Sequence, residues 1–389
     1  MSEARLTNSD IAELTAWRRH LHRHPELSGH EEWTAAEVVR ALQPLAPTEI
    51  VTRLGGHGVG AVFGGSGPSV LIRCELDALP IAETGTPPHR STVPGHGHLC
   101  GHDGHMAVLM GVARWLSRHP PNGRVILLFQ PAEEDGSGAK RVLEDPRFAA
   151  LTPDYAFALH NYPGLPVGRA LVAPGVMNCA SRGMKIKLRG RTSHASEPEQ
   201  AVSPTDAVAA LLTGLTALSS GQYPNDTSFA LATVTHASIG TPAFGIAPGD
   251  AEIWVTLRTR TDDLMAALVS QAEALVRDNA TQLAPEITYE DIFRHCENDP
   301  DATAILTSAL DAESITWLTE GLPMRASEDF GRFGDITKSA MFLLGAGADH
   351  PRLHQPDYDF PDDLIPIGAS VFIRAIQSAL KPKTRPRAG

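Results

Sequence analysis

Hydrophobic positions near the start of the chain recur at helical spacing. Between residues 11 and 21 apolar side chains return every three or four positions, which predicts one amphipathic face of a helix. Asn8, Ser9 or Asp10 is expected to cap this helix, because short polar side chains accept hydrogen bonds from its first free amides. The helix is expected to end near Pro25, since proline disfavours helical backbone in the residue before it.

Short unbroken apolar runs follow, and they alternate with further helical patterns. Runs without polar alternation are typical of strands buried on both faces, and helices between them favour a parallel or mixed α/β sheet. The expected strands are Val59–Phe63, Val70–Leu76, Val125–Phe129, Tyr155–Leu159 and, late in the chain, Ser339–Leu344. The expected helices between and after them cover residues 31–42, 104–116, 139–143, 302–310 and 364–380.

The pattern differs between residues 182 and 294. Strands here alternate apolar and polar positions, as in Ala251–Thr259, which is typical of a sheet with one solvated face. Two helical patterns, residues 204–218 and 262–278, accompany them. The sequence therefore predicts a discontinuous α/β domain, residues 1–181 and 295–389, interrupted by an inserted α+β domain, residues 182–294.

Composition narrows the class of protein. A chain of 389 residues suits two domains, and 42% hydrophobic with 20% charged residues excludes a disordered chain. No apolar run is long enough to span a bilayer, and the polar N-terminus predicts a cytoplasmic protein. The formal charge of −12, without a basic stripe, argues against a nucleic-acid partner. Four widely separated cysteines are expected to be free thiols or metal ligands.

Polar residues cluster directly after the expected buried strands, where ligands of open α/β sheets bind. Asp77 follows the second strand, Glu133 and Glu134 follow the third, and His160 follows the fourth. The last apolar strand leads through a glycine-rich turn to His350 and His354, and a loop with the sequence HGHLCGHDGH contributes Cys100 and His102. Asp103 in that loop is either a helix cap or part of the site.

Thiolate, imidazole and carboxylate donors together suit zinc, with manganese, cobalt and nickel as further options and magnesium disfavoured. The neighbouring pair Glu133 and Glu134 is informative because adjacent side chains diverge. One carboxylate can then bind metal while the other acts as a general base toward water.

With these residues in place, the chain resembles the M20 metallopeptidases, most closely the branch of hippurate hydrolases, N-acyl-amino-acid amidohydrolases and indole-acetyl-amino-acid hydrolases. The resemblance covers nearly the whole chain. Its landmarks, in order, are RRHLHRHPELSGHE from Arg18, RCELDALPIAETG from Arg73, HLCGHDGHMA from His98, FQPAEEDGSGA from Phe129, ALHNYPGLPVG from Ala158, SEDF from Ser327 and LHQPDYDF from Leu353.

The resemblance implies a zinc-peptidase-like catalytic domain that cleaves the amide of N-acyl amino acids of the N-acetyl or N-benzoyl type. Glu133 would be the general base acting on a metal-bound water. Asp77 would contact one of the metal-binding side chains and hold it in position without binding the metal itself. The inserted domain would form a homodimer, with higher oligomers left open, and offer His194 to the partner's active site. Two divalent metal ions per subunit would be held by Cys100, His102, Glu134, His160 and His354.

Two positions depart from the family pattern in the inserted domain. Glu199 stands where relatives usually show a second histidine, and Gly245 stands where asparagine is common. Both departures leave open which acyl group and which amino acid are recognised.

Three other functions remain open at this point. The same metal chemistry would serve a dipeptidase or carboxypeptidase. Cys100 and His102 could instead form a thiol nucleophile and its base, although that arrangement gives the glutamate pair and His160 no role. A catalytically silent metal-binding protein is the third alternative, because fold alone does not prove activity.

Overall fold

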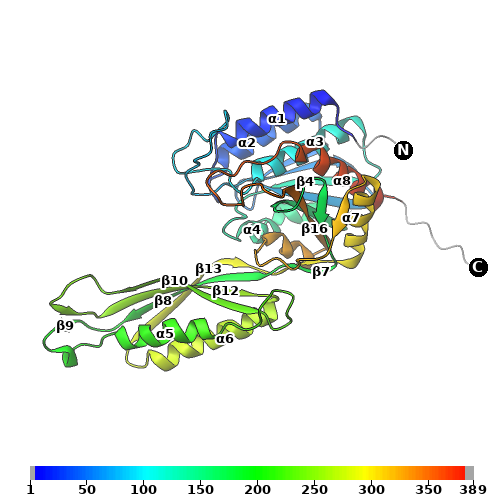
Figure 1. Ribbon diagram of the computed structural model, residues 1–389. Coiled ribbons are helices and arrows are strands. Elements are labelled where there is room, and N and C mark those ends of the chain that lie inside the picture. Colours follow the sequence, from blue (N-terminus) through cyan, green and yellow to red (C-terminus); the bar gives the residue numbers. More distant parts are fainter. Residues whose placement is uncertain (1–4, 382–389) are drawn as a thin grey trace, which may run out of the picture. The chain divides into compact units, whose positions relative to one another are not determined.

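The computed structural model describes residues 5–381, so the predictions made for residues 1–4 and 382–389 lie outside the described part of the chain (Figure 1). The chain divides into two compact units. Unit 1 comprises Met1–Met177, Glu297–Glu320 and Asp329–Gly389, and unit 2 comprises Asn178–Cys296 and Gly321–Glu328. The sequence pattern had not assigned the short segment 321–328 to the inserted part.

Unit 1 is built on an eight-stranded mixed sheet with the order β1-β2-β4-β3-β5-β16-β6-β15. Strands β3, β4, β5 and β16 run parallel to their neighbours within this group, so their carboxyl ends meet at one edge. This confirms the predicted α/β fold with a mixed sheet. The strands are β1 (Glu49–Leu54), β2 (Gly58–Gly64), β3 (Ser69–Glu75), β4 (Arg124–Gln130), β5 (Tyr155–Pro163), β6 (Arg169–Leu171), β15 (Thr316–Leu318) and β16 (Lys338–Gly347).

Helices cover this sheet on both sides, with α3 and α8 on one face and α4 on the other (Figure 1). Leu127, Phe157 and Phe342 from the central strands are fully buried in the resulting core. Among residues 5–381, no helix combines the length and apolar character that a membrane crossing requires. The helices of unit 1 are α1 (Asn8–His22), α2 (Glu32–Leu42), α3 (His102–Arg118), α4 (Gly138–Glu144), α7 (Pro300–Ala312) and α8 (Leu364–Ala379).

Unit 2 is an antiparallel sheet of order β10-β12-β8-β13, packed against α5 and α6. The alternation of buried and exposed residues along β12 puts Ile253, Val255 and Leu257 into the core with the apolar faces of the helices. The elements are β8 (Ala180–Arg189), β10 (Ala230–Ile239), β12 (Asp250–Thr259), β13 (Ala284–Phe293), α5 (Thr205–Ala217) and α6 (Asp262–Asn279).

Two local predictions need correction. The cap of α1 is Thr7, not Asn8, Ser9 or Asp10: its hydroxyl accepts a hydrogen bond from the Asp10 amide while the Asp10 carboxylate accepts one from the Thr7 amide. This reciprocal pair of hydrogen bonds is a capping box. It places the cap at Thr7, one residue before the first expected position, because it satisfies two free backbone amides at once. Strand β5 continues past Leu159, so His160 lies within the strand, where it pairs with Leu343 of β16.

Candidate metal centre

The parallel strands of unit 1 deliver the expected donors to one edge of the sheet. Glu134 follows β4, His160 lies in β5, and His354 follows β16. Cys100 and His102 flank Gly101, which precedes α3 with a φ of 91°. A side chain at Gly101 would lie 2.1 Å from Asn161 Oδ1, so this tight turn requires glycine both for its backbone and for its space.

All five expected metal ligands come together here in two groups that share Cys100. Cys100, His102 and His160 form one group and Cys100, Glu134 and His354 the other, with donor atoms inside each group within 4.8 Å of one another. Cys100 Sγ lies 3.5 Å from His160 Nε2, and His354 Nε2 lies 3.6 Å from Glu134 Oε2. The sulfur and the imidazoles are thus near enough to share one binuclear site.

Backbone carbonyls orient the imidazoles of His102 and His160 for coordination. His102 Nδ1 donates to the Asp77 carbonyl at 2.9 Å, and His160 Nδ1 donates to the Asn161 carbonyl at 2.8 Å. Each ring therefore turns the lone pair of Nε2 toward the cluster. Within the described residues, His102 Nε2 and Glu134 Oε1 are buried without a hydrogen-bond partner, which fits atoms that face a cation.

Electrostatics differ between the imidazoles of the cluster, since burial, with His105, lowers the pKa of His160 to about 3. Burial opposes protonation of His102, but its hydrogen bond to Asp77 and the nearby carboxylates raise its pKa to about 10. Burial raises the pKa of Glu134 to about 7, against the opposing effect of His102. Burial, with Glu134 and Glu133, also raises the pKa of the Cys100 thiol well above its usual range. A protonated thiol is a poor nucleophile, so the environment of Cys100 does not favour a cysteine hydrolase.

The two carboxylates expected to assist lie beside the cluster. Glu133 is 6% exposed, and its Oε2 lies 4.0 Å from His102 Nε2. Asp77 is fully buried; its Oδ2 accepts hydrogen bonds from Ser28 Oγ at 2.7 Å and from the Glu134 amide at 3.0 Å. Asp77 therefore contacts both His102 and the backbone of Glu134.

His194 belongs to unit 2, where it is exposed on β9 (Ser193–His194), a two-residue strand paired with β11 (Ile246–Ala247). Its Nδ1 lies 2.7 Å from the Ser196 hydroxyl. Glu199 is exposed in the turn that follows, and Gly245 accepts a backbone hydrogen bond from Ala195. The structure thus places both unusual residues in the His194 region.

Sequence reasoning missed a layer of buried polar residues behind the ligands. His105 Nδ1 contacts Glu75 Oε2 at 2.6 Å, and its Nε2 lies 3.1 Å from Asn161 Oδ1. Asn161 also donates to the Cys100 carbonyl at 3.2 Å and to the Tyr358 hydroxyl at 2.9 Å. One signal was available: His105 is three residues after His102, a spacing that puts both on the same side of α3.

A second buried network lies next to His102 in the chain. Asp103 is no helix cap; its Oδ2 pairs with Arg18 at 3.2 Å and with His22 Nδ1 at 2.9 Å. Burial opposes protonation of His22, but Asp103 and Glu83 outweigh it and raise the pKa of His22 to about 9. His89 and His98 also face this imidazole.

We expect the His22 contribution to stability to be lost at alkaline pH. Because the folded pKa of about 9 exceeds the ordinary value of 6.5, this contribution is complete below pH 6.5 and disappears as the pH rises through 9. Its size is about 3 kcal/mol at 1.36 kcal/mol per pKa unit. The measurement is the free energy of unfolding of wild type minus that of His22→Gln, at pH 6 and pH 9.5. A difference independent of pH would contradict the assignment.

Comparisons with known proteins agree with this geometry. A family model described as peptidase family M20/M25/M40 matches residues 71–378. The chain is 30% identical to the N-acetyldiaminopimelate deacetylase of Bacillus subtilis (strain 168), over 88% of this chain and 92% of that protein. It is 29% identical to IAA-amino acid hydrolase ILR1-like 2 of Arabidopsis thaliana, over 94% of this chain and 85% of that protein. The structure also resembles that of the YXEP protein of Bacillus subtilis, described as a dinuclear metal binding peptidase of the M20 family. The two superimpose with a TM-score of 0.81 at 25% identity, over 96% of this chain and 99% of that one.

Proposed function

The chain belongs to peptidase family M20/M25/M40 and is a hydrolase that acts on amide bonds, and on that premise we propose that it cleaves N-acyl amino acids to a carboxylate and a free amino acid. The resemblance seen in the sequence is thereby confirmed. The observation that supports the proposal best is the convergence of one thiol, three imidazoles and one carboxylate into two overlapping groups, with Glu133 beside them.

In this proposal two divalent ions, zinc or one of manganese, cobalt and nickel, are held by Cys100, His102, Glu134, His160 and His354. Such ions, when bound, supply Lewis-acid chemistry that polarises a carbonyl and acidifies water. The residues fit this role because buried Nε2 and Oε1 atoms of His102 and Glu134 have no partner among the described residues, and because the site raises the pKa of His102. Asp77 positions His102 and Glu134 and does not itself meet the substrate.

Glu133 is proposed as the general base. It takes a proton from the attacking water and returns it to the amide nitrogen, so that the amine departs neutral. Its carboxylate lies 4.0 Å from the His102 ring, close to the cluster without belonging to either three-residue group that contains Cys100.

The inserted part of the chain carries the remaining proposals. We infer a cytoplasmic homodimer formed through residues 182–294, in which His194 reaches the partner's active site and donates a hydrogen bond to the developing oxyanion. The exposure of His194 supports this inference, since its ring is accessible to a second molecule. Removing one donor of this kind costs about 3 kcal/mol elsewhere.

A substrate panel with counted metals tests the proposed activity. Purified protein is analysed for bound metals and assayed with N-acetyl-, N-benzoyl- and aminoacyl-amino acids. We expect turnover of the acylated substrates, loss of turnover with a strong chelator, and recovery with added divalent metal. Preference for the aminoacyl substrates would identify a dipeptidase instead, and activity that survives complete metal removal would reject the metal mechanism.

Asn161 gives a separate prediction about metal binding. Asn161→Leu removes the hydrogen bonds that hold the Cys100 carbonyl and the Tyr358 hydroxyl, so the ligand loop loses its fixed position. Loss of such outer contacts typically costs about 10–100-fold in metal affinity. Competition with a chelator of known affinity measures it, and Asn279→Leu, at the exposed end of α6, serves as the matched control. Unchanged affinity in folded Asn161→Leu protein would exclude this positioning role.

A further inference from the structure

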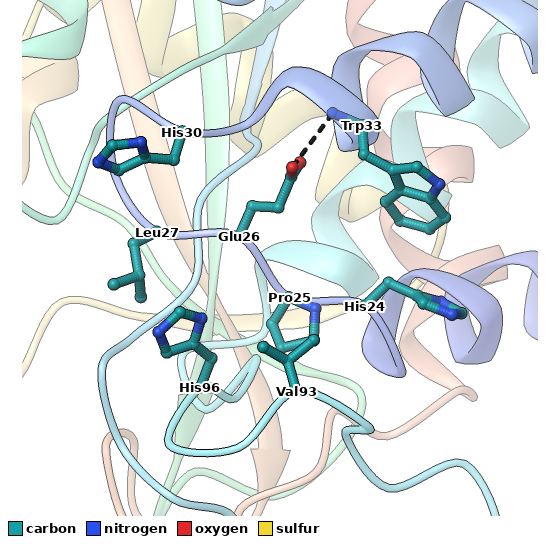
Figure 2. A pocket seen from close by; sticks show the side chains of 8 residues that line it. All are labelled: His24, Pro25, Glu26, Leu27, His30, Trp33, Val93 and His96. Atoms are coloured by element: carbon teal, nitrogen blue, oxygen red, sulfur yellow. Dashed lines mark hydrogen bonds between the residues drawn. The ribbon is translucent and has the colours of Figure 1, made fainter.

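A cavity of about 520 Å³ lies in unit 1 among residues to which the mechanism gives no role (Figure 2). Its walls are the apolar side chains of Pro25, Leu27, Trp33 and Val93, together with the imidazoles of His30 and His96. Figure 2 shows the Trp33 indole on one side of the cavity and Leu27, His30 and His96 on the opposite side. This volume is in the range of sites that take small organic ligands.

The one carboxylate in the wall is already occupied. Glu26 Oε2 accepts hydrogen bonds from the Thr34 amide and hydroxyl, both at 2.8 Å. Figure 2 shows the third hydrogen bond, which Glu26 Oε1 accepts from the Trp33 amide at 3.2 Å. These bonds satisfy free amides at the start of α2. Both oxygens of Glu26 are therefore held by donors of the helix, and Glu26 is not the group through which a ligand would be bound.

Imidazole nitrogens are the remaining polar groups of the wall. Within the described residues, the side chains of His30 and His96 make no hydrogen bond, so their nitrogens are available to a ligand. His24 is engaged: its Nδ1 donates to the His20 carbonyl, and its ring lies 4.7 Å from that of Trp33. The cavity thus joins flat apolar walls to two unused imidazoles that can donate to an anionic head group.

The cavity is separate from the candidate metal centre but shares a segment with it. None of the five expected ligands lines it. Leu27 lines the cavity, and the next residue, Ser28, donates to Asp77 at 2.7 Å. Leu27 also forms a β-bridge with Ala78, directly after Asp77. The two sites are therefore neighbours through one short piece of backbone.

We propose that this cavity is a second binding site that takes a small aromatic carboxylic acid, with the ring against Trp33, Pro25 and Val93 and the carboxylate toward His30 and His96. The apolar walls bury the ring, and the N–H groups of the two imidazoles can donate to the carboxylate. The site does not depend on the hydrolytic function proposed above.

Isothermal titration of the metal-loaded protein with 1-naphthoate tests the site. We expect a binding event at the cavity, in addition to any product-like binding at the metal centre, that Val93→Phe, which fills the cavity, weakens at least about tenfold, equivalent to 1.4 kcal/mol. The matched control is Val167→Phe, at a position that is 47% exposed and outside the cavity, and it should bind like wild type. The cation 1-naphthylmethylamine should bind at least about tenfold more weakly than 1-naphthoate.

A second variant covers the case in which Val93→Phe fails to fold. His96→Leu keeps bulk but removes the imidazole, so it should weaken 1-naphthoate and leave the neutral 1-naphthalenemethanol unchanged. Absence of binding to wild type, or 1-naphthoate binding that neither Val93→Phe nor His96→Leu alters, would overturn the proposal. Equal affinity for the amine would also overturn it. Hydrolysis is not read in this experiment, so its outcome is independent of the N-acyl amino acid assay.

Discussion

Glu133→Gln should lower kcat for N-acyl amino acid hydrolysis by about 10²–10⁴-fold while the metal content stays at the wild-type level. The amide is nearly isosteric with the carboxylate but cannot accept a proton from water at neutral pH. Glu133→Gln leaves all five expected ligands unchanged in sequence, although the Glu133 carboxylate also lies in a group of donors with His102 and Glu134. Steady-state kinetics and elemental analysis on the same preparation measure the two quantities.

The matched control for this experiment is Glu144→Gln. Glu144 is the last residue of α4, its side chain is 66% exposed, and it pairs only loosely with Lys140 at 3.8 Å. This variant should retain wild-type kcat and metal content. Undiminished turnover in Glu133→Gln would remove Glu133 from the mechanism, whereas loss of metal together with turnover would show that Glu133 is itself needed as a ligand.

Arg73→Met should destabilise the folded protein by about 3–5 kcal/mol, the cost of leaving buried charges without their partner. Arg73 is almost fully buried in β3; its guanidinium pairs with Glu75, donates to Gln130 at 3.0 Å, and lies 2.5 Å from Asp329 Oδ1. Without Arg73, the buried carboxylates of Glu75 and Asp329 lose the positively charged group that pairs with them. Chemical denaturation monitored by circular dichroism measures the change in the free energy of unfolding.

Arg189→Met provides the comparison with an exposed ion pair. Arg189 is 68% exposed and pairs at 3.0 Å with Glu286, which is 52% exposed, so water and salt screen the interaction. We expect a loss of at most about 1 kcal/mol for this variant. The structure indicates that the Arg73 pairs are shielded from water. Similar losses of stability in both variants would show that these pairs are hydrated in solution.

Much of the fold follows from local patterns of apolar residues. Unbroken runs predicted β2, β3, β4 and β16, and helical spacing predicted α3, because burial on both faces or on one stripe leaves a direct trace in the sequence. Strand β1 was missed for the same reason: only Leu54 of its residues is buried, so no apolar run marks it. The N-terminal cap was placed one to three residues late, since several short polar residues at the start of α1 could serve.

The candidate site also has some features that the sequence predicted and others that only the structure showed. The order of strand ends, read with the residue types that follow them, indicated where the donors lie, and the resemblance to the M20 metallopeptidases selected the five that the structure brings together. The ring orientation of His102 and His160 was beyond sequence reasoning, because it depends on which backbone carbonyl lies within 3 Å of Nδ1. The cavity beside Trp33 was equally hidden, since it is a property of how two loops and a helix leave space between them.

The sequence by itself determined the buried and exposed faces of the main elements and the set of donors that follows the central strands. The tertiary structure alone decided which buried polar groups are partners, such as Arg73 with Asp329, 256 positions apart, and His22 with Asp103. The physical reason is that the two kinds of interaction differ in how closely they depend on distance and direction. Hydrophobic burial is non-directional and leaves a periodic pattern, whereas a hydrogen bond or ion pair requires two atoms to meet within about 3 Å, which only the packed chain specifies.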